Sequence, residues 1–307
     1  MIEHLVISGG AIVGFSFYGI LHTLIMQDHL NMDDIRTIHA TSVGTVLAVM
    51  ITLGYDLNVI KTYLLDRPWK EVWKMNFNSI VRAIKDGGMF DRTTILQTIE
   101  PLLLGKDLSS DITLEEFYAF NKKEIHFYTT EYSKLELVDI SYKTHPTWKV
   151  VDAIFASSSV PGLCIPFFHD DTYYIDGATV MNYPLQCCLD EGHDREKILG
   201  LNIAWKEGGN EDSLRKPFTT PTSSYKLFEY VISIFMKLWY LVRHEMTEDE
   251  KNVPHQITVI CPSDPLAIFN AMETKEERLR LWGLGETAAV SYIEKCQTIS
   301  SMNFSSE

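Results

Sequence analysis

The sequence has few features of an exported or membrane-spanning protein. Its five cysteines are an odd number without regular spacing, which favours free thiols over a disulfide framework. No uninterrupted apolar run reaches the roughly 20 residues that are needed to span a bilayer. Residues 1–4 also lack the basic start of a secretory signal. We therefore expect an intracellular, cytoplasmic protein.

Basic residues are scarce relative to acidic ones. The chain of 307 residues has 27 Lys and Arg against 41 Asp and Glu, which gives a formal charge of −14. This excess argues against nucleic acid as a partner, but it leaves open peripheral contact with a membrane through a local patch. With 46% hydrophobic residues, the chain has enough apolar material for a large core.

Two β-turn-α units open the chain. A β-rich run at 5–7, a glycine turn and a helical pattern over 12–26 form the first unit. A strand over 35–39, a turn of small residues and an apolar helix over 43–53 form the second. Two successive units of this kind predict an α/β fold, with a parallel sheet covered by helices.

The rest of the chain alternates between predicted helices and strands. We expect mostly helices over 56–104, and strands over 125–130, 135–140, 198–203 and 257–260, a hairpin from 167–168 to 172–175, and helices over 148–155 and 274–295. The predicted helix starts are the N-caps Asp56 and Asp91 and a capping box at Thr113 and Glu116, and the predicted breakers are Gly54, Gly87, Gly88 and Gly105.

The second turn has the layout of a nucleophile elbow. Ser42 lies between Ala40 and Gly44, close to the G-x-S-x-G pattern in which a sharp strand-to-helix turn exposes the serine hydroxyl. Gly44 leaves room beside the hydroxyl, and the helix N-terminus favours developing negative charge. Because Ala40 replaces the first glycine, this motif alone does not establish a catalytic serine.

A catalytic serine also needs a base and donors for the oxyanion. Gly9, Gly10 and Ala11 follow the first strand and offer backbone N–H groups at a helix start, although an ordinary glycine turn explains them equally well. No Lys-Ser/Thr pair follows this loop, which argues against a P-loop.

The residues themselves leave the base open. Among ten histidines, we expect His39 to pack beside the sheet and His169 to point into water from a polar hairpin. Asp176 ends a predicted strand, and Gly177 and Ala178 leave room around it. Asp-Gly is equally a common turn, so position alone does not assign a base.

Considered together, four segments resemble the patatin-like phospholipases, lipid acyl hydrolases with a Ser–Asp dyad. Residues 8–14 resemble the G-G-G-x-[RK]-G loop of that family, and residues 40–44 its G-x-S-x-G elbow. Residues 153–162 resemble the A-S-x-x-[VI]-P block, and residues 176–184 the D-G-[GA]-x-x-x-N-x-P signature.

The resemblance covers about residues 4–204 and implies a fold. We expect one patatin-like domain over 1–307, with three layers and a mostly parallel central sheet flanked by helices. Residues 224–298 would complete this domain with helices and one strand.

The resemblance also implies roles for individual residues. Ser42 would attack the acyl ester of a lipid, as in a phospholipase A or lysophospholipase, and Asp176 would be the general base. The oxyanion hole would consist of Gly9, Gly10 and Ala11, and the supporting motif residues are Gly14, Ala40, Gly44, Gly177 and Ala178. No cofactor and no metal is expected, and no ligand cluster with calcium spacing is present.

Two departures from the family pattern leave alternatives open. Ala11 replaces the third glycine, which we expect to be tolerated only with a negative φ. Val13 replaces the usual Arg or Lys, which weakens the case for a phospholipid substrate. A small-ester or thioester hydrolase is one alternative, and a catalytically silent member that binds lipid or a partner is another.

The most apolar long segment is residues 225–242, which has only a narrow polar stripe. Packing in the core or against a subunit is one interpretation of this helix. We also expect that it borders the acyl-chain pocket together with the loop over 208–223. The oligomeric state stays open.

Overall fold

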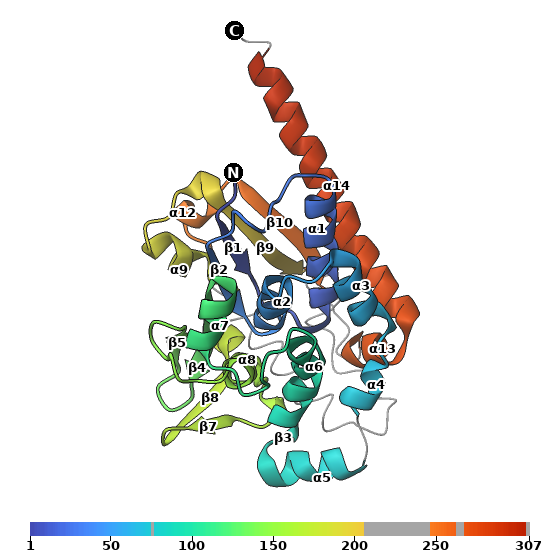
Figure 1. Ribbon diagram of the computed structural model, residues 1–307, viewed down its shortest axis with the longest axis vertical. Coiled ribbons are helices and arrows are strands. Elements are labelled where there is room, and N and C mark those ends of the chain that lie inside the picture. The colour runs from blue at the N-terminus through green and yellow to red at the C-terminus, as the bar shows by residue number, and fades with distance from the viewer. Residues whose placement is uncertain (75–76, 206–245, 262–266, 305–307) are drawn as a thin grey trace, which may run out of the picture.

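An eight-stranded mixed sheet forms the centre of the computed structural model (Figure 1). The structure describes residues 1–74, 77–205, 246–261 and 267–304. In spatial order the strands are β10 (His255–Cys261), β9 (Ile198–Trp205), β1 (His4–Ile7), β2 (Thr37–Thr41), β4 (Glu124–Glu131), β8 (Thr172–Asp176) and β7 (Phe167–His169), and β5 (Glu136–Ile140) also pairs with β4. The run from β10 to β4 is parallel, whereas β5, β8 and β7 pair antiparallel. This arrangement confirms the predicted α/β class with a mostly parallel sheet.

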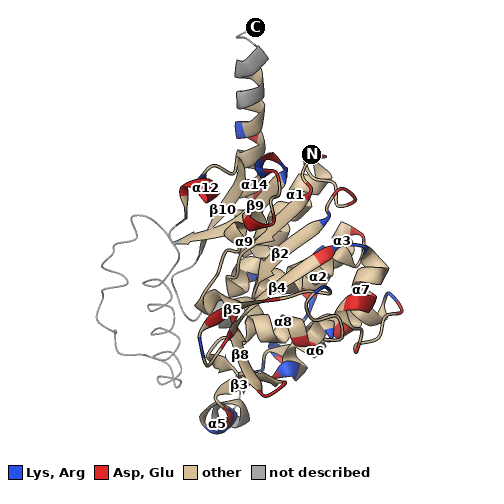
Figure 2. Cartoon of the chain, turned by 90° about the vertical axis from the view of Figure 1, so that its left-hand side faces the viewer, with Lys and Arg blue, Asp and Glu red and all other residues tan. Residues whose placement is uncertain are grey.

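Both faces of the sheet are covered, as the alternation along β1 shows. Leu5 and Ile7 belong to the larger apolar core, whereas Val6 on the opposite face belongs to a smaller one with Leu185 and Cys188. Figure 1 shows α9 (Leu185–Asp190) and α12 (Glu248–Lys251) on the opposite side of the sheet from α1 (Gly14–Met26) and α2 (Val43–Thr52). Charged residues lie mainly on the helices and loops around the sheet (Figure 2).

The remaining helices complete the larger core and its surroundings. The C-terminal helix α14 packs along α1 and extends beyond the sheet in Figure 1. The remaining helices are α3 (Leu57–Asp66), α4 (Trp69–Val72), α5 (Phe77–Asp86), α6 (Arg92–Leu104), α7 (Leu114–Asn121), α8 (Val150–Ser158), α13 (Ala267–Glu273) and α14 (Lys275–Phe304). No helix among the described ranges is long and apolar enough to cross a membrane.

Several local predictions are confirmed. The side chains of Asp56 and Asp91 cap α3 and α6, and Thr113 and Glu116 form the expected capping box of α7. β7 and β8 pair as the expected hairpin. These signals are reliable because a cap or a short turn depends on residues that are adjacent in the chain.

Other boundaries differ from the predictions. The second strand occupies Thr37–Thr41 and not 35–39, because its ladders with β1 and β4 both begin at Thr37. Gly88 lies in a short strand, β3 (Gly88–Phe90), since its lack of a side chain lets the backbone approach β6 (Gly162–Cys164) closely. α14 continues to Phe304, beyond the helix predicted over 274–295. The loop over 208–223 and the segment over 225–242 lie outside the described residues.

The topology brings three strand ends together. β1 and β2 are parallel neighbours, so Gly9 and Ser42 leave the sheet at the same edge. β4 lies between β2 and β8, and β8 runs antiparallel to β4. The last residue of β8, Asp176, pairs with Thr129 of β4. Residues far apart in the sequence therefore meet at one edge of the sheet.

Candidate active site

Ser42 lies in a strained turn between β2 and α2. Its backbone has φ 55° and ψ −125°, a conformation that non-glycine residues rarely adopt. The Ser42 N–H donates to Ser157 Oγ at 2.9 Å, which anchors the turn to α8. A Cβ at Gly44 would lie 2.5 Å from the Ile7 carbonyl oxygen, so only glycine permits this approach of α2 to β1.

The Ser42 hydroxyl is directed at Asp176. Ser42 Oγ donates a hydrogen bond to Asp176 Oδ2 at 2.6 Å, and the Ala178 N–H donates to Asp176 Oδ1 at 2.8 Å. Gly177 permits this turn because a Cβ there would lie 2.2 Å from the Tyr128 carbonyl oxygen. Each carboxylate oxygen of Asp176 therefore has one donor.

Burial sets the acidity of Asp176. The side chain is 1% exposed, and no described cation pairs with it. Removal from water disfavours the carboxylate and raises the pKa of Asp176 to about 6, while the hydrogen bonds from Ser42 and Ala178 act in the opposite direction. A carboxylate with a pKa near neutrality is a stronger proton acceptor than an ordinary aspartate.

The glycine loop lies beside Ser42, but it offers fewer donors than expected. A Cβ at Gly9 would lie 3.1 Å from the Ser42 Cβ, which places the loop next to the hydroxyl. The Gly9 N–H donates to the Asn182 carbonyl oxygen at 3.1 Å and is not free for an oxyanion. No described acceptor engages the N–H groups of Gly10 and Ala11. Of the three N–H groups expected in an oxyanion hole, two thus have no described acceptor in this structure.

Ala11 also differs from its expected conformation. Its φ is +48°, whereas a negative value was expected for alanine at this position. A non-glycine residue in this region costs roughly 1–2 kcal/mol, because its Cβ crowds the backbone carbonyl. Ala11 is an exposed residue that begins the 3₁₀ turn Ala11–Val13 leading into α1.

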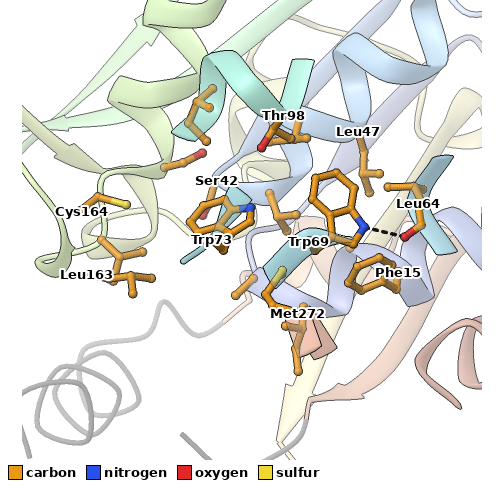
Figure 3. Close-up of a pocket in the computed structure, with 18 of the residues that line it drawn as sticks. Phe15, Ser42, Leu47, Leu64, Trp69, Trp73, Thr98, Leu163, Cys164 and Met272 are labelled. Atoms are coloured by element: carbon orange, nitrogen blue, oxygen red, sulfur yellow. Dashed lines mark hydrogen bonds between the residues drawn. The ribbon is translucent and has the colours of Figure 1, made fainter. Parts of the chain in front are cut away.

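An apolar cavity of about 120 Å³ opens from Ser42 (Figure 3). Ala11 and Ser42 both line it, and aromatic and aliphatic side chains form its walls. None of the described residues that line the cavity is charged. The wall residues labelled in Figure 3 include Phe15, Leu47, Leu64, Trp69, Trp73, Leu163 and Met272.

Neither histidine considered as a base forms a described hydrogen bond with Ser42. His39 packs beside the sheet as expected, and its Nδ1 lies 2.8 Å from Tyr128 Oη. His169 does not simply point into water, because its ring lies 4.4 Å from the ring of Trp148 and its side chain is 35% exposed. The described geometry brings Asp176, and neither of these histidines, to the serine.

Sequence reasoning missed several contributors to the site. Ser157 bridges the Ser42 N–H and the Tyr128 carbonyl oxygen, which accepts from Ser157 Oγ at 2.6 Å. The serine-rich block marked this region, but nothing in it distinguished Ser157 from its neighbours. Trp69 and Trp73, on or beside the short helix α4, carry no motif and are recognised only from the cavity that they line.

The site and the fold together define a serine hydrolase-like α/β protein, and comparisons with known proteins identify its family. The model of the patatin-like phospholipase family matches residues 5–188. The chain therefore belongs to the patatin-like phospholipase family.

Two viral proteins are among the relatives. An uncharacterized protein, R571 of Acanthamoeba polyphaga mimivirus, is 25% identical over 233 residues, which are 76% of this chain and 74% of that protein. The probable lipid hydrolase 463L of Invertebrate iridescent virus 6 is 23% identical over 195 residues, or 63% of this chain and 65% of the relative. The second match thus spans less than two thirds of that protein.

A solved structure supports the fold. The crystal structure of VipD from Legionella pneumophila matches with a TM-score of 0.54 and 17% identity, covering 95% of this chain and 67% of that one. At this level of identity, the similarity shows the shared patatin-like fold alone.

Proposed function

We propose that this protein is a lipid acyl hydrolase that cleaves fatty acyl esters through an acyl-enzyme on Ser42. The observation that supports this proposal most directly is the 2.6 Å hydrogen bond from Ser42 Oγ to Asp176 Oδ2, because Ser42 lines an apolar cavity whose described walls carry no charge. Asp176 is the general base in this proposal, and no cofactor takes part.

Acylation begins with proton transfer. Asp176 Oδ2 accepts the hydroxyl proton as Ser42 Oγ attacks the ester carbonyl, and burial strengthens Asp176 as the acceptor. The negative charge that develops on the carbonyl oxygen is stabilised by the N–H groups of Gly10 and Ala11. Because Ser42 begins α2, the positive end of that helix dipole adds to the same effect.

The proton then leaves with the alcohol. As the tetrahedral intermediate collapses, Asp176 returns the proton to the departing alkoxide, and the acyl group remains on Ser42. Asp176 next removes a proton from the attacking water, and the second collapse returns that proton to Ser42 Oγ. The net reaction is an ester plus water giving an acid and an alcohol, with both residues restored.

The cavity indicates which part of the substrate is recognised. Its walls suit a hydrocarbon chain, since burial of apolar surface is favourable by about 25 cal/mol per Å². Val13, which occupies the position of the usual family cation, is fully buried and offers nothing to a phosphate. This observation favours an alternative substrate, a small ester or thioester without a phosphorylated head group.

Fluorophosphonate labelling followed by mass spectrometry tests the nucleophile. We expect adduct formation on Ser42, loss of the adduct in Ser42→Ala, and retention in Ser133→Ala, an exposed turn serine. Asp176→Asn is expected to lose ester hydrolysis, whereas Asp170→Asn in the exposed hairpin turn retains it. Folded protein that reacts with neither probe nor ester would instead support a silent, lipid-binding member of the family.

A substrate series then distinguishes a lipid acyl hydrolase from a hydrolase of small esters or thioesters. Purified protein is assayed on lysophospholipid, diacyl phospholipid and neutral p-nitrophenyl esters or acyl thioesters of matched chain length. Preference for long-chain lipid esters supports the lipid hydrolase. Efficient turnover confined to short neutral esters or to thioesters would support the alternative.

A further inference from the structure

Histidines gather on the face of the sheet opposite α1 and α2. His4, His39 and His126 lie on the neighbouring strands β1, β2 and β4, and their side chains share the face that α9 covers. The ring of His39 stacks on that of His126, with centroids 4.4 Å apart, and His193 stacks on His4 at 3.7 Å. Glu191 enters the same cluster from the segment after α9.

Hydrogen bonds fix the orientation of two of these rings. His39 Nδ1 lies 2.8 Å from Tyr128 Oη, and His126 Nδ1 lies 2.8 Å from Asp139 Oδ2. The Nε2 atoms of both rings are buried; that of His39 forms no hydrogen bond with a described residue, and that of His126 has Glu124 Oε1 at 3.2 Å as a charged neighbour. His39 is 0% exposed, so its free nitrogen faces only the cluster.

The Nε2 atoms lie around one carboxylate, and because the rings of His39 and His126 are parallel to within 3°, a ring must turn for both Nε2 atoms to face a shared ion. His126 Nε2 lies 3.5 Å from Glu191 Oε1, and His39 Nε2 lies 3.8 Å from Glu191 Oε2. His193 Nε2 lies 3.0 Å from Glu191 Oε2. Two ligands that bind one tetrahedral zinc ion at 2.0–2.1 Å lie about 3.4 Å from each other. The three observed separations from Glu191, 3.0, 3.5 and 3.8 Å, fall on both sides of this ligand-to-ligand distance.

We propose that His39, His126 and Glu191 bind a divalent transition-metal ion of the Zn²⁺ type. Their ligand atoms all lie within 4.8 Å of one another, and His39 forms a second such group with Cys188 and His193. Cys188 and His193 are therefore the candidates for a fourth ligand, and His193 Nε2 already lies 3.0 Å from Glu191 Oε2. Imidazole and thiolate donors suit zinc and not calcium or magnesium, which prefer oxygen.

The surroundings of the cluster have the form of a second coordination shell. Metal-binding histidines normally donate a hydrogen bond from their other ring nitrogen to a neighbouring oxygen atom, which fixes the orientation of the ring. Asp139 and Tyr128 occupy these positions for His126 and His39. Glu124 Oε1 lies 3.2 Å from His126 Nε2 and is an additional neighbouring oxygen.

The position of the cluster indicates a structural role. An ion there would tie β2 and β4 to the segment that follows α9, and so would connect strands to a loop that few apolar contacts hold. The ion would be separated from the cavity at Ser42 by the sheet itself. The proposal is therefore independent of the proposed hydrolase activity, and its readouts do not require an assay of that activity.

The test begins with the metal content of the full chain, purified without chelator or affinity metal. We expect about one zinc per chain by plasma mass spectrometry, and a melting temperature that falls with chelator and recovers with added Zn²⁺. Co²⁺ added to the stripped protein is expected to give the visible spectrum of a tetrahedral site. A thiolate-to-cobalt band assigns Cys188 as the fourth ligand, and its absence assigns His193.

Matched variants locate the ligands. Glu191→Ala, at a half-exposed position, is expected to weaken Co²⁺ and Zn²⁺ binding at least tenfold, whereas Glu136→Ala in an exposed strand position leaves it unchanged. His126→Gln is expected to abolish binding, with the exposed His29→Gln as its control.

Three results would overturn the proposal. One is stripped, folded protein that neither binds Co²⁺ nor changes its melting temperature with Zn²⁺. Another is Glu191→Ala with unchanged affinity. The third is an equal loss of binding in the control variants. A cluster that binds no metal would instead be held together by a proton shared between imidazole and carboxylate. If His126→Gln fails to fold, the comparison of Glu191→Ala with its control Glu136→Ala tests the proposal by itself.

Discussion

Ser42 Oγ and Asp176 Oδ2 lie 2.6 Å apart, although the two residues are separated by 134 positions in the chain. β4 explains this proximity, because it pairs with β2 on one side and with β8 on the other. The Tyr128 carbonyl of β4 accepts from Ser157, which in turn accepts the Ser42 N–H, and the same carbonyl lies against Gly177. One peptide group of the central strand thus positions both partners.

The ionisation of Asp176 predicts a pH dependence of hydrolysis. A base acts only when it is deprotonated, and the pKa of Asp176 is raised to about 6 by burial. We expect kcat/KM for a neutral ester to rise tenfold per pH unit below about 6 and to level off above it. The measurement is a pH profile with a non-titrating substrate. A profile that is flat between pH 4.5 and 7.5 would contradict Asp176 as the base.

The same group predicts how stability changes with pH. The pKa of Asp176 is higher in the folded protein, about 6, than its ordinary value of 3.8, so folding favours the protonated form. This contribution to stability is fully present below pH 3.8 and is lost as the pH rises through 6. Asp176→Asn does not ionise, so its melting temperature should fall less than that of the wild type between pH 4 and 7. Equal slopes in the two proteins would contradict the raised pKa.

The positive φ of Ser42 predicts an unusual order of stability. Ser42→Gly relieves the strain of φ 55°, whereas Ser42→Ala keeps it, and both lose the hydrogen bond to Asp176. We expect the glycine variant to be about 1 kcal/mol more stable to unfolding by urea than the alanine variant. At Ser291, an exposed position within α14, the order should reverse because glycine weakens helices. The same order at both positions would contradict strain at the elbow.

The sequence was sufficient to predict that Ser42 and Asp176 meet, but not the surroundings of this pair. Neither short motif assigns its residue alone, and the pair was selected because four segments in order resemble one family. The occupied N–H of Gly9 depends on Asn182, and the cavity walls depend on how Trp69 and Trp73 pack, which local patterns do not encode. Contacts of this kind form only when the sheet assembles.

The histidine cluster shows the same limit. Its members lie on three strands and a loop, with spacings unlike any short metal-binding motif, and no metal site was expected from the sequence. Strand register brings His39 beside His126, because the two are direct partners in the β2–β4 ladder. A pattern search along the chain cannot find a pairing that register determines.

Ala11 provides a test of the corrected loop geometry. Because its φ is +48°, Ala11→Gly is expected to stabilise the protein by about 1 kcal/mol, whereas Ala288→Gly within α14 destabilises it by a similar amount. The backbone N–H is retained, so kcat should stay within about twofold of the wild type. Both quantities are obtained from urea unfolding and ester kinetics. A destabilised Ala11→Gly would show that the methyl contributes more than its backbone conformation costs.

The wall of the cavity predicts the chain-length preference of the enzyme. Trp73 is half-buried, lines the cavity, and packs edge-on against Phe90 with ring centroids 5.1 Å apart. Trp73→Ala removes the indole from the wall, so the cavity should accept longer acyl groups. Val46 lines the same cavity, and Val46→Phe should fill part of it. Because one methylene in an apolar pocket changes kcat/KM by roughly 10-fold or more, the two variants should shift the preference in opposite directions.

The measurement is kcat/KM for p-nitrophenyl esters of increasing chain length. We expect the ratio of long-chain to short-chain turnover to rise about tenfold in Trp73→Ala and to fall about tenfold in Val46→Phe. Tyr132→Ala removes an exposed aromatic side chain distant from the cavity lining, and its ratio should equal that of the wild type. If all three variants kept the wild-type ratio while remaining folded, the acyl chain would have to bind elsewhere, and the cavity at Ser42 would lose its proposed role.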